Sequence, residues 1–370
     1  MEEQDFHFFE TVVLNGLAVL QGERTPQSLY YMVKGRKANQ VWQDVNNFNL
    51  HSYYRLFPWI SRGLWEQTMK NLMEKKWVSN TNVAQKNAIS SFELTSSGYQ
   101  QLCEQNKTYQ LERWLSEING ISITEEATLF RLQALLMVQT ISQLLYANAH
   151  FSPIVQNREI QRQIKQLLAE PVGRAAWLDG LAAELYLLMD MLEPSLQQQF
   201  FLQWTGASQV GLTSRQIAYQ FRESFLFTEV KLLSIWSSMY CEVKENKSGQ
   251  FPLLQKLCQL QSAQKPPISM SAWETYKMLQ KDITLEEIAS RRAIKLNTVE
   301  DHLIEVALMS LPCKYGRWVS EQQIEFVHEA SERLQTKRLR LLKDELGHDY
   351  SYLQIRLALA LRGASSWKQI

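Results

Sequence analysis

The sequence predicts a mainly α-helical protein with three parts: a winged-helix-like N-terminal domain carrying a small β-hairpin, an all-helical middle domain, and a C-terminal helical helix-turn-helix domain. Apolar residues recur at helical spacing through most of the 370 residues. Two short β-like segments follow one N-terminal helix pattern, and "ITLEEIASRRAIKLNTVEDHL" (283–303) has the layout of a helix-turn-helix. A chain of this length favours two or three domains, which we expect at residues 1–118, 122–262 and 268–370.

In the N-terminal region the pattern predicts a helix over 8–20 and a second one after Thr25, a candidate N-cap followed by Pro26. A third helix is expected over about 61–75. The segment "WVSNTNVAQKNAISSFELT" then has two β-like pieces around a polar tip, and "TSSGYQQL" restarts a helix. Helices followed by a hairpin suggest a winged helix.

The middle region contains almost only helix signals. Its segments "RLQALLMVQTISQLLYA" and "WLDGLAAELYLLMDML" are apolar around most of their circumference, so we expect both to be deeply buried. Capping boxes, in which a hydroxyl or amide residue precedes an acid or amide by three positions, mark the helix starts of the middle and last regions. The predicted pairs are Thr213–Gln216, Thr284–Glu287, Asn297–Glu300, Ser320–Gln323 and Ser351–Gln354.

Several classes of protein are disfavoured by composition and motifs. The four cysteines lie far apart without a C-x-x-C pair and the six histidines are scattered, so we expect no metal site and no cofactor. Neither a phosphate-binding glycine loop nor a G-x-S-x-G turn is found, which argues against an enzyme. The acidic start is unlike a secretory signal, and the longest uncharged run is interrupted by amides. We expect a cytoplasmic, nucleoid-associated protein.

Positive charge is concentrated near the N-terminus. From residue 23 to 95 there are ten Lys and Arg against five Asp and Glu, whereas the middle and last regions are close to neutral. Clustered Lys and Arg side chains attract the phosphates of nucleic acid through their local electric field. The predicted nucleic-acid-binding residues are Lys34, Arg36, Lys37, Arg62, Lys70, Lys75, Lys76 and Lys86.

Aromatic residues are interleaved with these cations, and unpaired bases stack on such rings. Taken one at a time, each ring is more readily explained as core of a small domain. The combination with excess positive charge favours weak, sequence-independent binding of single-stranded or forked DNA. The rings are Tyr30, Tyr31, Trp42, Tyr53, Tyr54, Phe57, Trp59, Trp65 and Trp77.

The second helix of the C-terminal helix-turn-helix is acidic where base contacts normally lie. Glu300, Asp301 and Glu305 would face that surface, and carboxylates oppose the approach of DNA. Glu300 and Asp301 also suit the positive end of a helix dipole, which leaves Glu305 as surface charge. Ala293 stands where a glycine often eases the turn. We therefore predict a protein partner at this module, contacted by Arg291, Arg292, Glu300, Asp301 and Glu305.

A family resemblance is carried by both ends of the chain. The stretch "SAWETYKMLQKDITLEEIASRRAIKLNTVEDHLIEVALM", with "LLKDELGHDYSYLQIRLALALRG" after it, resembles the helicase helix-turn-helix domain found at the end of some RecQ-type helicases. The N-terminal "YYMVKGRKANQVWQDVNNFNLHSYYRLFPWISRGLWEQTMKNL" is similar to the YpbB proteins of low-GC Gram-positive bacteria. The resemblance implies a non-enzymatic companion of a RecQ-type DNA helicase in recombination or repair. It carries no catalytic residues.

Two other functions remain open at this stage. A sequence-specific transcription regulator would read duplex DNA with both terminal domains and bind symmetric half-sites as a dimer. A scaffold would bind no nucleic acid at all.

Overall fold

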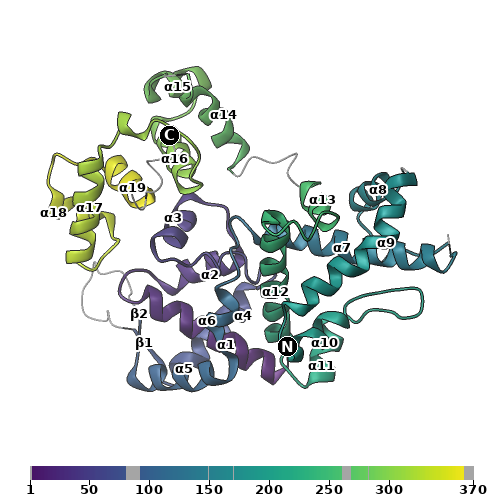
Figure 1. The fold of residues 1–370 in the computed structure, drawn as a ribbon. Helices are drawn as coiled ribbons and strands as arrows, with labels where there is room; N and C mark the ends of the chain where they lie inside the picture. The colour runs from purple at the N-terminus through teal and green to yellow at the C-terminus, as the bar shows by residue number, and fades with distance from the viewer. Residues whose placement is uncertain are drawn as a thin grey trace. The chain divides into compact units, whose positions relative to one another are not determined.

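The computed structural model describes residues 2–80, 92–148, 150–169, 171–260, 268–281 and 283–361, and it divides into two compact units. The first comprises residues 1–13 and 102–265, and the second comprises residues 14–101 and 266–370. Helices α1 (Glu3–Leu20) and α5 (Ser96–Tyr109) contribute to both. The expected fold class is confirmed, because the described chain is mostly helical and has one small antiparallel strand pair (Figure 1). The three domain boundaries remain predictions.

Buried aromatic rings form much of the core of the first unit. Trp236 packs against Phe200, Trp204 and Phe130, with ring centres 5.0, 5.5 and 5.9 Å apart. Near the chain start, the carboxylate of Asp5 accepts a 2.9 Å hydrogen bond from the hydroxyl of Ser224, the N-cap of α12. The other helices of this unit are α6 (Leu111–Leu115), α7 (Thr124–Leu145), α8 (Arg158–Leu167), α9 (Pro171–Asp190), α10 (Pro194–Phe201), α11 (Ser214–Phe221), α12 (Phe225–Glu245) and α13 (Leu254–Gln259).

One expectation for the first unit is wrong in part. Helix α9 was expected to be deeply buried along its length, yet Tyr186 and Leu187 near its end and Met191 just beyond it are exposed. Leu145, at the end of α7, and Tyr146 are exposed too. A nearly all-round apolar sequence sets no unique inward face, so local packing decides which part of the helix is covered.

The N-terminal part of the second unit has the predicted helices-then-hairpin order. After α2 (Pro26–Lys34) and α3 (Asn39–Asn47), helix α4 (Arg62–Glu74) starts at Ser61, whose hydroxyl accepts from the Leu64 amide. Strands β1 (Val78–Asn80) and β2 (Phe92–Leu94) pair antiparallel, with Val78 opposite Leu94. The polar tip of the predicted hairpin lies outside the described residues.

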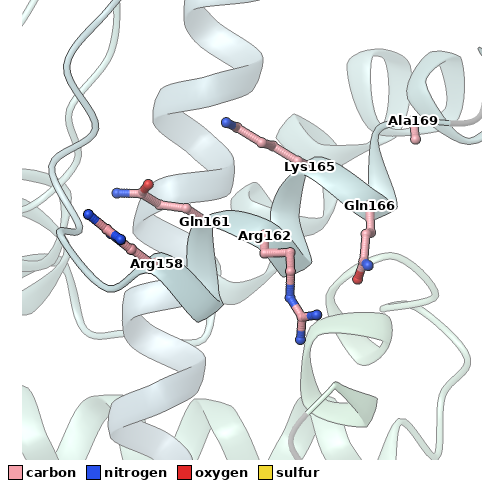
Figure 2. Close-up of a pocket in the computed structure, with 6 residues that line it drawn as sticks. All are labelled: Arg158, Gln161, Arg162, Lys165, Gln166 and Ala169. Carbon is pink, nitrogen blue, oxygen red and sulfur yellow. The ribbon is translucent and has the colours of Figure 1, made fainter.

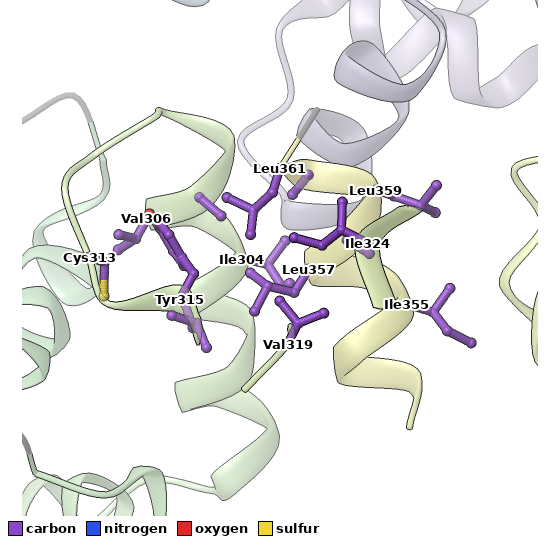
Figure 3. Packing of buried hydrophobic residues seen from close by; sticks show 14 of the residues in the cluster. Ile304, Val306, Cys313, Tyr315, Val319, Ile324, Ile355, Leu357, Leu359 and Leu361 are labelled. Carbon is purple, nitrogen blue, oxygen red and sulfur yellow. The ribbon is translucent and has the colours of Figure 1, made fainter. Parts of the chain in front are cut away.

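The C-terminal part of the second unit is helical and has its own apolar cluster, which includes Ile304, Tyr315, Val319, Ile324 and Leu357 (Figure 3). The capping boxes predicted at Thr284, Ser320 and Ser351 are present, as is the one at Thr213 in the first unit. Its elements are α14 (Met270–Leu279), α15 (Leu285–Arg292), α16 (Leu296–Leu308), the short 3-10 helix η1 (Tyr315–Arg317), α17 (Glu321–Arg333), α18 (Leu339–Leu346) and α19 (Tyr352–Ala360).

The helix-turn-helix consists of α15 and α16, joined by a turn in which Ala293 adopts a left-handed conformation with φ +52°. The predicted start of the second helix is wrong, because Lys295 rather than Asn297 occupies the N-cap and no side chain caps it. Helix α3 from the N-terminal part packs against both α16 and α19. Residues from the two ends of the chain therefore form one unit.

Candidate nucleic-acid interface

The end of α2 and the segment after α3 form an exposed basic surface. Backbone hydrogen bonds from Arg55 to Met32 (2.8 Å) and from Phe57 to Val33 (3.1 Å) hold the two segments side by side. Gly35 ends α2 with φ +74°, and a Cβ atom there would lie 2.5 Å from Cγ of Arg55. A glycine is thus required both for the turn and for the close approach.

Three predicted cations gather at this place. The Lys34 ammonium donates to the Ile60 carbonyl at 3.2 Å, and the Arg36 guanidinium lies 4.5 Å from the ring centre of Tyr31. Lys34, Arg36 and Lys37 are exposed, and within the described ranges none of them forms an ion pair with a carboxylate. We name this surface the KGRK patch and define it as Lys34, Arg36, Lys37, Arg55 and Trp59.

The aromatic residues of the region divide sharply by exposure. Trp59 is 54% exposed and directly precedes Ile60, whose carbonyl accepts from Lys34, whereas Tyr31 and Trp77 are half-buried. The remaining rings are buried, so most of the nine aromatic residues are core residues, as expected for each taken singly. The buried set is Tyr30, Trp42, Tyr53, Tyr54, Phe57 and Trp65. Trp59 is therefore the ring of this set best placed to stack on a base.

The other predicted cations of the N-terminal region contribute less to the positive electrostatic potential of the surface. On α4, Arg62 pairs with Glu66 at 2.7 Å and Lys70 with Glu74 at 3.6 Å, both one helical turn apart. Each pair places a carboxylate beside the cation, so the exposed face of α4 is close to neutral.

The remaining predicted cations lie at the hairpin. Lys75 and Lys76 are exposed just before it, and the Lys75 ammonium is 4.5 Å from the ring centre of Trp77. Lys86 lies outside the described residues.

Helix α16 cannot enter a groove along its length. Six consecutive residues, 302–307, are buried, and with 3.6 residues per turn they leave no exposed face over that span. The neighbours are α14, α15, α19 and α3. The exposed residues lie at the start of the helix, at Lys295, Leu296 and Asn297, and Asp301 is partly exposed.

The three carboxylates of this helix do not form an acidic surface. Glu305, expected as surface charge, is 2% exposed and accepts hydrogen bonds from the backbone amide and the hydroxyl of Ser269. That expectation is wrong, because i+4 spacing from Asp301 places Glu305 over the start of α14. Asp301 pairs with Arg356 at 2.5 Å. Glu300 is half-buried, and burial raises the pKa of its carboxyl group while Arg356 opposes the shift.

The two arginines predicted to bind a partner differ in availability. Arg292 donates to the Ser271 carbonyl at 2.8 Å and to the Thr275 hydroxyl, so its guanidinium ties α15 to α14. Arg291 is exposed. Of the five residues predicted to contact a partner, Arg291 is the one whose charge is open to solvent without competing bonds among the described residues.

Two features of the interface were missed by sequence reasoning. Arg55 joins the KGRK patch although it lies eighteen or more positions from the other cations, and its positive φ of 61° was not anticipated. The signal for it was the cluster of turns implied by "NLHSYYRLFPW", which returns the chain to α2. The covering of α16 by α3 had no sequence signal, because it joins segments about 250 residues apart.

In the described ranges no helix is both long and apolar enough to cross a membrane. Likewise, the side chains that the structure describes contain no group of three or more His, Cys, Asp or Glu able to hold a metal ion.

The fold and this site define a helix-turn-helix protein with a basic winged-helix-like surface. Residues 271–359 match the family described as a helix-turn-helix domain. Protein YpbB of Bacillus subtilis (strain 168) is 23% identical over 356 residues, which cover 95% of this chain and 97% of that protein. The chain is therefore similar to a YpbB protein along nearly its whole length. No solved structure matches it. Together these similarities indicate a DNA-related role.

Proposed function

We propose that the protein is a non-enzymatic accessory of a RecQ-type DNA helicase in recombination or repair, and that it contacts single-stranded or forked DNA through the KGRK patch. The observation that carries the DNA contact is the exposed cluster of Lys34, Arg36 and Lys37 beside Trp59, which no carboxylate neutralises among the described residues. Cations track the phosphates and an exposed ring accepts an unpaired base. This combination favours weak binding that does not depend on sequence.

Fluorescence anisotropy with labelled single-stranded, forked and duplex oligonucleotides over a salt series tests the DNA contact. Replacing Lys34, Arg36 and Lys37 by Gln removes three phosphate contacts and lowers the slope of log affinity against log salt by about 2 on single strands. The control, which removes two charges, is Arg62→Gln with Lys70→Gln, whose cations are already paired with Glu66 and Glu74. An unchanged slope in the triple variant contradicts the proposed contact.

The helicase contact is assigned to the C-terminal part of the second unit. The turn between α15 and α16 presents Arg291, Lys295 and Leu296 to solvent, whereas Arg292, Asp301 and Glu305 are held by internal partners. We therefore place the partner surface at this turn rather than along α16. Glu300, one helical turn after Leu296, flanks this surface.

Retention of the cognate RecQ-type helicase on the immobilised full-length chain tests this part. The full chain is needed because α3 covers α16 and α19, so residues 268–370 alone would expose an apolar face. Arg291→Glu with Lys295→Glu should abolish retention at modest salt. Lys277→Glu with Lys281→Glu, which makes the same charge change on and after α14, should not. Equal retention of all three proteins would remove the turn from the interface.

A sequence-specific regulator is the rival function, and the helix-turn-helix match favours it. It predicts a tight complex with one duplex sequence, well above binding to others. The burial of residues 302–307 argues against it, because side chains there cannot reach base edges. The same anisotropy series separates the two functions, and a flat signal at low salt would favour a scaffold that binds no DNA.

A further inference from the structure

The polar face of α8 in the first unit is a second concentrated positive surface. Figure 2 shows Arg158, Gln161 and Lys165 along one side of the helix, and Arg162 and Gln166 pointing down from the adjacent side. They line a shallow hollow of about 430 Å³. Positions 158, 162 and 165 are spaced by four and three residues, so the three cations share one helix face.

The rest of α8 explains why this face is fixed outward. Ile160 and Ile164 are buried on the opposite side, and Asn157 caps the helix by accepting from the amides of Glu159 and Ile160 at 2.9 and 3.2 Å. A helix anchored in this way cannot rotate its cations into the core. The polar face is presented to solvent by the packing of the apolar one.

The charges on this face are only partly compensated. Glu159, the single acid of the helix, lies on its flank and pairs with Arg162 at 2.7 Å. Arg158 and Lys165 are exposed, and in the part of the chain that the structure describes neither forms an ion pair. Arg174 adds a further exposed cation at the end of the helix, where it donates to the Leu168 carbonyl at 3.0 Å. The surrounding region is slightly acidic overall, which makes the strip a local feature rather than part of a general positive charge.

We propose that the α8 strip, defined as Arg158, Gln161, Arg162, Lys165 and Gln166, is a second binding surface for the phosphate backbone of nucleic acid. Arg158 and Lys165 are seven residues apart, or about 10 Å along the helix axis, so one strand can contact them through different phosphates. Gln166 adds an exposed amide donor for a phosphate or sugar oxygen, whereas the Gln161 amide group donates to the Val155 carbonyl at 2.7 Å. The strip offers no exposed aromatic ring, so it binds the backbone and not the bases.

The salt dependence of binding by the full chain to a labelled single-stranded oligonucleotide tests the proposal. Arg158→Gln with Lys165→Gln should lower the salt slope by about 1.4, or 0.7 for each lost phosphate contact. Glutamine is a good helix former, so α8 should persist, and circular dichroism checks that it does. The matched control is Arg113→Gln with Lys247→Gln, which removes the same charge from the same unit at cations paired with Glu193 and Glu245.

The outcomes are distinct from those of the KGRK patch. The effect of the α8 variant should persist when Lys34, Arg36 and Lys37 are also replaced, because the two surfaces contribute separate contacts. The proposal is overturned if the α8 variant leaves the salt slope unchanged, both in the wild-type protein and in the protein that lacks the KGRK cations. The same result is expected if the strip binds an acidic protein instead. An equal drop in the control would mean that net charge, not this surface, controls binding, and would overturn it as well.

Discussion

The carboxylate of Glu305 accepts hydrogen bonds from the backbone amide and the hydroxyl of Ser269, at the start of α14. Ser269 is the N-cap of that helix, and its hydroxyl also accepts from the amide of Ala272 at 3.1 Å. The acid of α16 thus completes the cap of α14. This relationship explains why an acidic residue occurs on the second helix of a helix-turn-helix without forming a surface for either DNA or a partner.

Replacing Glu305 with Ala should destabilise the protein by about 1–3 kcal/mol, because the Ser269 amide and hydroxyl lose an acceptor in a part-buried contact. Glu305→Gln keeps an oxygen acceptor and should cost less. Chemical denaturation followed by tryptophan fluorescence measures both changes, with Glu329→Gln on the exposed face of α17 as the control. Stability of the Ala variant equal to that of the wild type would contradict this role.

The same residue predicts a pH dependence. Burial raises the pKa of Glu305 above its usual 4.5, and the bonds from Ser269 oppose the shift. A raised pKa in the folded state means that the folded protein holds the proton more tightly, so its contribution to stability is full below pH 4.5 and is lost as the pH rises through the folded-state value. The wild type should therefore gain stability relative to Glu305→Gln on acidification through that window. A difference independent of pH would show that the carboxyl group titrates normally.

The ion pair between Asp301 and Arg356 supports a third prediction. Arg356 also donates to the side-chain oxygen of Gln43 at 3.3 Å, so it links α16 and α19 to α3. The side chains of Arg356 and Asp301 are 17% and 40% exposed, so we expect the ion pair to contribute only modestly to the free energy of unfolding. A double-mutant cycle with Asp301→Asn and Arg356→Gln should give a coupling energy of about 1 kcal/mol. A value indistinguishable from zero would show that the two side chains act independently.

The helix-turn-helix turn offers a stabilising substitution. Ala293 has φ +52° and ψ +43°, a left-handed conformation that costs an L-residue about 1 kcal/mol and costs glycine nothing. Ala293→Gly should raise the free energy of unfolding by about 0.5 kcal/mol after the greater flexibility of the unfolded chain is subtracted. Thermal denaturation measures it, with Ala289→Gly inside α15 as the opposite case, expected to destabilise. A loss of stability in Ala293→Gly would mean that the Ala293 methyl group makes a contact worth more than the strain.

Local patterns predicted the fold better than the site. Hydroxyl residues three positions before an acid or amide marked four helix starts correctly, because a cap is decided by neighbours in the chain. The pattern at Asn297 failed since Lys295 begins α16 two residues earlier. Apolar periodicity likewise predicted α1 and α4, whereas α3 was not predicted.

The charges of the candidate site were predicted less well, since they depend on tertiary contacts. Arg62 and Lys70 counted as cations in the sequence, but each has a carboxylate one turn away. Asp301 meets Arg356 fifty-five positions on, and α3 reaches α16 across most of the chain. No local pattern contains these pairings. The cluster at Lys34, Arg36 and Lys37 was predictable because three exposed cations at one helix end need no distant partner to be brought together.

Trp59 distinguishes binding of unpaired bases from simple attraction to phosphate. Its ring is 54% exposed beside the KGRK cations, so Trp59→Ala should remove a stacking contact worth about 1–3 kcal/mol and weaken binding to single strands about tenfold. Duplex affinity should change little, because stacked pairs present no free face, and the salt slope should stay the same since no cation is lost. Trp59→Phe should restore most of the affinity. Tyr352→Ala, at a ring that is 51% exposed on α19, is the control. Equal losses on single strands and duplex would show that Trp59 supports the patch structurally and does not stack on bases.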